Sequence, residues 1–162
     1  MNVATHLEGA PIGVLNLLGN GVLRGELYGS DVNPLNVSLK LGTERVYTVF
    51  AAGGGRFGGR EHYTLGLGLG VHLPVQQRLF VDVDAVASVL NLDRKWTMDH
   101  SLYQLRTIAG FQLSPRFALT VGPTLNVQVA DEPDTLLPLG QWVISQGHEA
   151  RVWLGLQVGV RI

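Results

Sequence analysis

The chain has 162 residues, enough for a single domain with its own core or for one closed barrel. Its formal net charge of -1 gives no support for nucleic-acid binding, which needs a basic footprint, and the absence of cysteine excludes disulfides and cysteine-ligated zinc. Only 15% of the residues are charged and 21 are glycine, which favours an all-β chain with a poorly charged exterior over an ordinary soluble domain, where about 25% are charged.

Consecutive strands without amphipathic helices are predicted along the chain. The weaker strands come first, at 11–18, 22–29, 34–41 and 45–53, and the clearer ones follow at 62–73, 78–90, 102–113, 116–130 and 150–162. The clear strands are longer than the usual five or six residues of globular sheets and match the roughly 9–11 residues that cross a bilayer at a tilt. No run of 18 apolar residues predicts a transmembrane helix.

The connections between these strands alternate in length. "GTE", "PVQQ" and "SPR" are predicted to be tight turns, whereas "GGGRFGGRE", "NLDRKWTMDHS" and "DEPDTLLPLGQWVISQGHE" are predicted to be long loops. Transmembrane barrels have short turns on one side of the membrane and longer loops on the other. The alternation therefore favours an antiparallel, up-and-down β-barrel of about 8–10 strands, of the transmembrane, outer-membrane type.

Each clear strand has an apolar face and a face of small and polar residues. In 62–73, Leu65, Leu67 and Leu69 alternate with Gly66, Gly68 and Gly70. A membrane barrel turns the apolar face toward lipid and the small, polar face into a crowded lumen, where the glycines would make room for bulky groups such as Phe80 and Trp153. The alternative is a soluble, lipocalin-like barrel that binds a small apolar ligand inside the leucine face.

Charged residues recur on the polar face. Asp82 and Asp84 lie two residues apart in one strand, and Arg106 faces the same way on the next strand. Carboxylates and guanidinium groups on one face predict an internal ion-pair network, which we expect to contain Asp82, Asp84, Arg106, Arg151 and Arg161.

No residue pattern predicts catalysis, a cofactor or a metal. The five histidines lack metal-ligand spacing, and "GGGRFGGR" at 53–60 lacks the lysine and the helix of a phosphate-binding loop. Ion pairing with arginine explains Asp82 and Asp84 more simply than acid–base catalysis does. We therefore expect a protein that is not an enzyme, with no cofactor.

The opening "NVATHLEGAPIGVLNLLGNG" resembles the repeats of bacterial outer-membrane surface-repeat proteins, with units of the type G-x-x-I-G-L-x-N-x-A. Gly9, Ile12, Gly13, Leu15 and Asn16 carry this pattern, and the later chain resembles the barrel segment that follows such repeats. The resemblance implies that residues 1–20 end a repeat region, that 21–162 form one barrel, and that the chain is a C-terminal fragment.

The same resemblance implies a location and partners. It implies a surface-exposed barrel in the outer membrane of a Gram-negative bacterium, with a structural or adhesive role and no assigned enzymatic activity or ligand. Membrane lipid and the outer-membrane assembly machinery would be its partners, and nucleic acid would not.

Overall fold

The computed structural model describes residues 21–57, 60–92, 100–130, 142–145 and 149–162. Within these ranges the chain forms only strands and turns. The strands are β1 (Val22–Ser30), β2 (Leu35–Gly42), β3 (Val46–Phe57), β4 (Arg60–Pro74), β5 (Leu79–Leu92), β6 (His100–Ser114), β7 (Phe117–Ala130), β8 (Trp142–Ser145) and β9 (Glu149–Arg161). The repeat-like residues and the predicted strand 11–18 lie outside the described residues.

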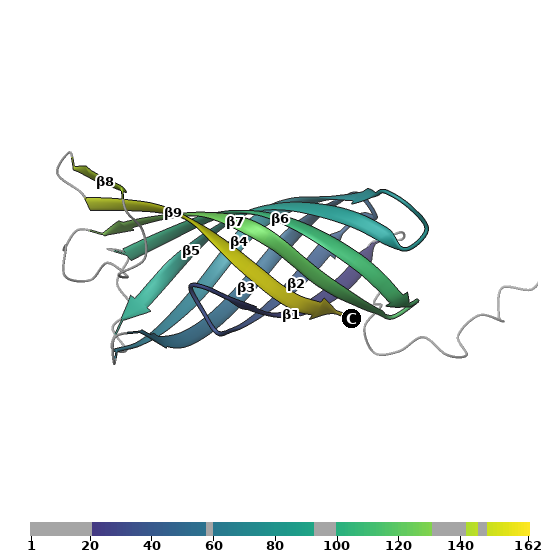
Figure 1. Cartoon of the computed structure of the whole chain (residues 1–162), viewed down its shortest axis with the longest axis horizontal. Helices are drawn as coiled ribbons and strands as arrows, with labels where there is room; N and C mark the ends of the chain where they lie inside the picture. Colours follow the sequence, from purple (N-terminus) through teal and green to yellow (C-terminus); the bar gives the residue numbers. More distant parts are fainter. Residues whose placement is uncertain (1–20, 58–59, 93–99, 131–141, 146–148) are drawn as a thin grey trace, which may run out of the picture.

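Eight of these strands close into a barrel. Each pairs antiparallel with its neighbour in the order β1-β2-β3-β4-β5-β6-β7-β9, and β1 pairs with β9 to complete the ring (Figure 1). Two backbone hydrogen bonds of 2.9 Å, from Gly25 N to Ile162 O and from Ile162 N to Gly25 O, extend this last pairing. The short β8 pairs with β9 at one end of the barrel. The predicted antiparallel up-and-down barrel is therefore confirmed, with eight strands in the ring.

Among the described residues, no helix is long and apolar enough to cross a membrane.

The ends of the barrel differ in their connections. One end, here called the turn end, holds the turns 43–45, 75–78 and 115–116 together with the start of β1 and the end of β9. The other end, here called the loop end, holds the connection 31–34, the ends of β3, β5 and β7 and the starts of β4, β6 and β9. The prediction of a long loop at "GGGRFGGRE" is wrong, because β3 and β4 continue through this stretch and pair as far as Phe57 and Arg60.

The apolar face of the strands is the outer surface of the barrel. The side chains of Leu67 and Leu69 are 57% and 66% exposed, whereas residues of the opposite parity are enclosed. A Cβ added to Gly68 would lie 2.9 Å from Val86 Cα, and one added to Gly70 would overlap Tyr47 and Asp84. The glycine face of β4 therefore lies against the lumen at close quarters.

The partners predicted for those glycines are wrong. Ser88, Val86, Asp84 and Tyr47 fill the space beside Gly66, Gly68 and Gly70. Phe80 instead packs against Gly110 on β6, and Trp153 joins Val32, Leu90 and Leu102 in a separate apolar cluster. The difference follows from the register, because Phe80 lies opposite Pro74 on β4, beyond the glycine row.

Candidate functional site

Six charged residues of the lumen form one group near the turn end, here called the lumen charge cluster. It consists of Glu26 on β1, Lys40 on β2, Asp82 and Asp84 on β5, Arg106 on β6 and Arg161 on β9. Side chains of a strand point alternately out of the barrel and into it, and all six residues occupy positions that point inward. The cluster joins five strands across the interior of the barrel.

Lys40 is at the centre of this cluster. Its Nζ lies 3.1 Å from Glu26 Oε1, 2.9 Å from Asp82 Oδ2 and 3.0 Å from Asp84 Oδ2, and its side chain has no exposed surface. A buried ammonium is strongly disfavoured unless it is paired and hydrogen-bonded. Three carboxylates around one ammonium meet that requirement and leave an excess of negative charge for the arginines to neutralise.

The two arginines neutralise the remaining charge. Arg106 Nη2 donates a hydrogen bond of 2.7 Å to Asp84 Oδ2. Arg161 donates to Glu26 Oε1 through Nε at 3.0 Å and Nη2 at 2.5 Å, and it also donates to Asp82 Oδ2. Counting Lys40, three cations face three carboxylates, so the formal charge of the cluster is zero. Removing any single member would leave an uncompensated charge inside the barrel.

Aromatic side chains surround the cations. The Lys40 ammonium lies 5.0 Å from the Tyr47 ring centroid, and the guanidinium of Arg161 lies 4.3 Å from the Phe80 ring centroid. Tyr47 also donates a hydrogen bond of 2.6 Å from its hydroxyl to Asp84 Oδ1. Such cation–π contacts stabilise a desolvated charge.

His72 borders the cluster on the side of the turn end. Its Nδ1 lies 2.6 Å from Asp82 Oδ1, and its side chain is 18% exposed while Asp82 is fully enclosed. His72 and Asp82 are direct partners in the β4–β5 ladder, which fixes their separation. The imidazole therefore separates the carboxylate of Asp82 from the solvent at this end.

The structure brings together four of the five residues predicted for the network, namely Asp82, Asp84, Arg106 and Arg161. Arg151 is half-buried near the loop end, opposite Gln128 in the β7–β9 ladder. It precedes Arg161 by ten residues on one strand, which is about 34 Å in an extended chain. Arg151 was predicted to join the network because it lies on the same face of the strand as Arg161. It lies outside the cluster because the two arginines are far apart along that strand.

Glu26 and Lys40 are the cluster members that the sequence prediction missed. Lys40 has the parity of Asn36 and Ser38 on the polar face of its strand, so its inward direction was readable from the sequence. Glu26 pairs with Arg161 in the β1–β9 ladder, a contact that forms only because the barrel closes. An inventory of every charge with inward parity would have found both residues.

The β1–β2 turn closes the lumen at the loop end. Val32 and Asn33 are buried, and Asn33 Nδ2 donates hydrogen bonds of 2.8 Å to Thr64 Oγ1 and 2.9 Å to Asn36 Oδ1. Gly53 allows this inward fold, because a Cβ there would overlap Asn36 and Asn33. The glycine-rich end of β3 is therefore a strand shaped to accept the turn, which explains why its composition resembles a loop.

A hydrogen bond ties this turn to the last strand. Trp153 Nε1 donates to Asp31 Oδ2 at 2.6 Å, and the indole packs in the apolar cluster with Val32. The lumen is thus filled by the charge cluster toward one end and by the inward turn toward the other. Such filling is expected of an eight-stranded barrel.

The chemistry of the charge cluster is that of a neutral, closed network. Each carboxylate contacts at least one permanent cation, and within the described ranges no three His, Asp or Glu side chains come together as a metal site requires. The cluster can therefore fix the positions of five strands relative to one another.

Comparison of the chain with protein-family models, with curated proteins and with solved structures finds no match.

Proposed function

We propose that this chain is a membrane-spanning β-barrel of the bacterial outer-membrane type, exposed at the cell surface, with a structural or adhesive role and no catalytic activity. The observation that carries the proposal is the direction of the side chains. Large apolar residues cover the outside of the barrel, whereas the inside holds the charge cluster and many polar residues beside two small apolar clusters. An apolar outside around a polar interior is the arrangement that a hydrocarbon solvent favours.

The apolar exterior extends around the whole barrel. Every strand of the ring carries at least one large apolar side chain that is exposed, such as Leu27, Leu39, Phe50, Leu67, Leu79, Leu105, Leu119 and Leu156. Soluble monomers rarely expose an apolar patch larger than a few hundred Å². A belt of this kind is strongly disfavoured in water and is favoured in a bilayer.

The filled lumen supports a structural or interaction role rather than transport. The charge cluster and the inward β1–β2 turn occupy the interior, and eight strands enclose too little space for a wide channel. The segments at the loop end would then present the chain to binding partners outside the cell. Membrane lipid and the outer-membrane assembly machinery remain the proposed partners.

The lipocalin-like alternative has less support. It requires the leucine rows to line a cavity for a small apolar ligand, but the described leucines of β4 face outward and the interior holds charged and polar groups. An apolar ligand would have to displace ion pairs of the lumen charge cluster, which is energetically costly.

Folding in detergent tests the membrane proposal. Unfolded protein is diluted into detergent micelles and, separately, into buffer, and unboiled samples are compared with boiled samples by gel electrophoresis. We expect a band that shifts on boiling only after folding in micelles. A monomeric, β-rich protein that is stable in buffer without detergent would contradict the proposal.

A further inference from the structure

We propose that the turn end of the barrel is a docking surface for anionic phospholipid headgroups, with a principal site at Arg78. The inference rests on the proposed membrane location and adds the class of lipid that this end of the barrel prefers.

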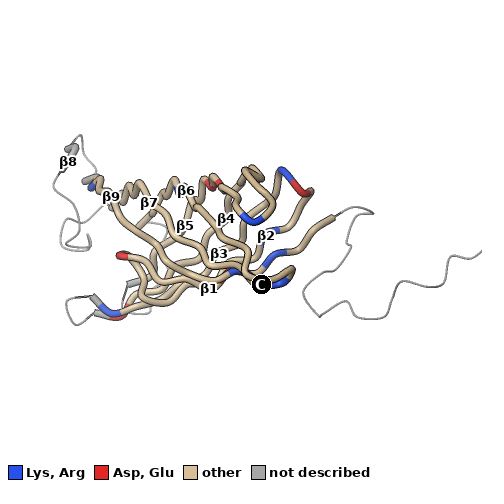
Figure 2. Tube along the Cα trace, turned by 45° about the vertical axis from the view of Figure 1, so that its right-hand side comes forward, with Lys and Arg blue, Asp and Glu red and all other residues tan. Residues whose placement is uncertain are grey.

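Arginines recur at equivalent positions around the turn end. Arg45, Arg78 and Arg116 each directly precede the strand that follows their turn, and Arg24 lies near the start of β1. Glu44 is the acidic side chain of this rim. Figure 2 shows the blue segments gathered at this end of the tube. Because the lumen charge cluster is neutral, the rim keeps a formal side-chain charge of +3 (four arginines and one glutamate).

The backbone holds two of these arginines in place while their side chains extend into solvent. Arg45 O accepts a hydrogen bond of 2.7 Å from His72 N, and Arg78 O accepts one of 2.8 Å from Gln112 N. Both residues are exposed, and neither guanidinium has a polar partner among the described residues. Fixed backbone positions with free guanidinium groups suit the binding of an external anion.

The rim directly borders the apolar belt. Val46, Val75 and Leu79 are exposed apolar residues next to the arginines, at 55%, 60% and 40% exposure. A positive rim beside an apolar surface matches the headgroup layer of a bilayer, where basic residues attract anionic lipids. An acidic soluble protein would provide the charge but would leave the apolar border uncovered.

The hollow at Arg78 has the composition of a headgroup site. Its volume is about 550 Å³, and it is lined by Gln76, Gln77, Arg78, Leu79 and Phe111. The guanidinium and the two side-chain amides can donate hydrogen bonds to a phosphodiester, and the leucine and phenylalanine can contact the glycerol and the first methylene groups.

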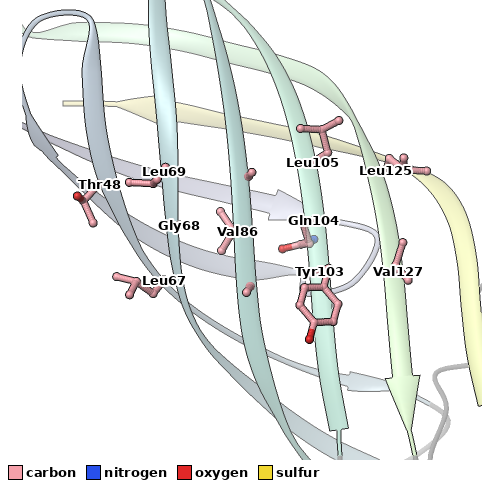
Figure 3. A pocket seen from close by; sticks show the side chains of 12 residues that line it. Thr48, Leu67, Gly68, Leu69, Val86, Tyr103, Gln104, Leu105, Leu125 and Val127 are labelled. Atoms are coloured by element: carbon pink, nitrogen blue, oxygen red, sulfur yellow. The ribbon is translucent and has the colours of Figure 1, made fainter. Parts of the chain in front are cut away.

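A furrow suited to a hydrocarbon chain lies further along β5 on the outer surface. Its floor includes the small residues Ala85 and Ala87, which pair with Leu69 and Leu67 on β4 and with Leu105 and Tyr103 on β6. Figure 3 shows these larger side chains on the two neighbouring strands. Six residues separate Leu79 from Ala85, or about 20 Å of strand. A strand tilted by about 40° crosses half of a hydrocarbon layer about 30 Å thick over a similar length.

The width of this furrow selects its occupant. The strands β4 and β6 are two strand spacings apart, about 9.5 Å between backbones, and their leucines narrow the space further. An α-helix with its side chains is about 10–12 Å wide and does not fit, whereas a single acyl chain does. With its phosphate in the hollow at Arg78, one phospholipid would reach this furrow with an acyl chain.

Lipid selectivity in bilayers of defined composition tests this proposal. The folded barrel is placed in phosphatidylcholine bilayers that contain a minor fraction of phosphatidylglycerol, and spin-labelled versions of both lipids report their relative association with the protein. We expect phosphatidylglycerol to be preferred by about five-fold for each engaged arginine. The preference should fall as salt is raised.

Arginine-to-glutamine variants at the two ends of the barrel locate the effect. Arg78→Gln, alone or with Arg45→Gln, should abolish most of the preference, whereas Arg56→Gln near the loop end should leave it unchanged. An absent preference in the unmodified barrel, or an equal loss with Arg56→Gln, would overturn the lipid proposal while the barrel stays inserted. Failure to insert into either bilayer would instead overturn the membrane proposal.

Discussion

The two faces of β4 follow different rules although they alternate along a single strand. Leu65, Leu67 and Leu69 project outward into free space, whereas Gly66 and Gly68 face lumen atoms so close that a Cβ would overlap them. In the proposed membrane location, the outer face needs apolarity and tolerates changes of shape, because a fluid hydrocarbon phase has no fixed contour. The inner face needs correct volume and balanced charge, because its neighbours are fixed. Substitutions on the two faces should therefore have different effects.

The largest effect is expected from breaking the charge balance of the lumen. Asp84→Ala leaves Lys40 and Arg106 without one of their carboxylates, and we expect a loss of about 3–5 kcal/mol in the free energy of unfolding. Urea unfolding in detergent micelles, followed by tryptophan fluorescence, measures it. The double variant Asp84→Asn/Arg106→Gln removes one charge of each sign and should cost less than the sum of its two single changes. A loss below about 1 kcal/mol for Asp84→Ala would show that the cluster is hydrated rather than closed.

A charge on the outer face should have the next largest effect. Leu67 lies at the middle of β4, and Leu67→Arg should cost about 2–4 kcal/mol in a bilayer because the guanidinium would enter the hydrocarbon layer. Equilibrium unfolding from lipid vesicles measures this cost. Leu67→Val, which keeps the position apolar, should change stability by less than about 1.5 kcal/mol. Equal stability of the arginine and valine variants would mean that this face contacts water.

Added volume on the inner face should have a smaller but distinct effect. Gly68→Leu places a branched side chain against Val86, and overpacking of this kind costs about 1–3 kcal/mol. The fraction of protein that gives a heat-modifiable band after refolding reports it. Leu67→Val is the matched control on the adjacent residue. If Gly68→Leu and Leu67→Val refold to the same extent, the assignment of inner and outer faces is wrong.

The smallest effect is expected at the loop end. Trp153→Phe removes the hydrogen bond to Asp31 but keeps most of the apolar packing with Val32, so we expect a loss of about 1 kcal/mol. Asp31 is partly exposed, so water can replace the lost donor. Thermal unfolding in micelles measures the change, with Tyr103→Phe on the outer face as a control that should leave stability unchanged. A loss comparable to that of Asp84→Ala would mean that the inward turn, rather than the charge cluster, holds the barrel together.

The period of two in the sequence was enough to predict the barrel and which residues share a face. It predicted that Asp82, Asp84 and Arg106 lie together because they are on adjacent strands with the same parity. The contact between Glu26 and Arg161 was missed because it joins the first and last strands, and no local pattern shows which strand closes the ring. The same alternation grouped Arg151 with Arg161. It shows whether a side chain points into the barrel but not where along the barrel axis that side chain lies.

The glycine-rich stretch at 53–57 was the main error in the fold. Composition predicted a loop there, but the structure extends β3 through Gly53, Gly54 and Gly55. The cause is tertiary, because the β1–β2 turn folds into the lumen beside Gly53 and Gly55, where an added Cβ would overlap Asn33 and Asn36 or Pro34. A rule based on local composition has no access to that contact.

The contact between the outer face and hydrocarbon is the central claim, and site-directed spin labelling tests it most directly. Because the chain has no cysteine, single substitutions at Leu67, Leu105 and Leu119 can each carry one label, with the exposed turn residue Pro115 as the reference for water. In lipid bilayers, the account predicts that labels at the three leucine positions collide mainly with dissolved oxygen and that the label at Pro115 collides mainly with a polar nickel chelate. Labels at the three leucine positions that collide mainly with the nickel chelate would contradict it.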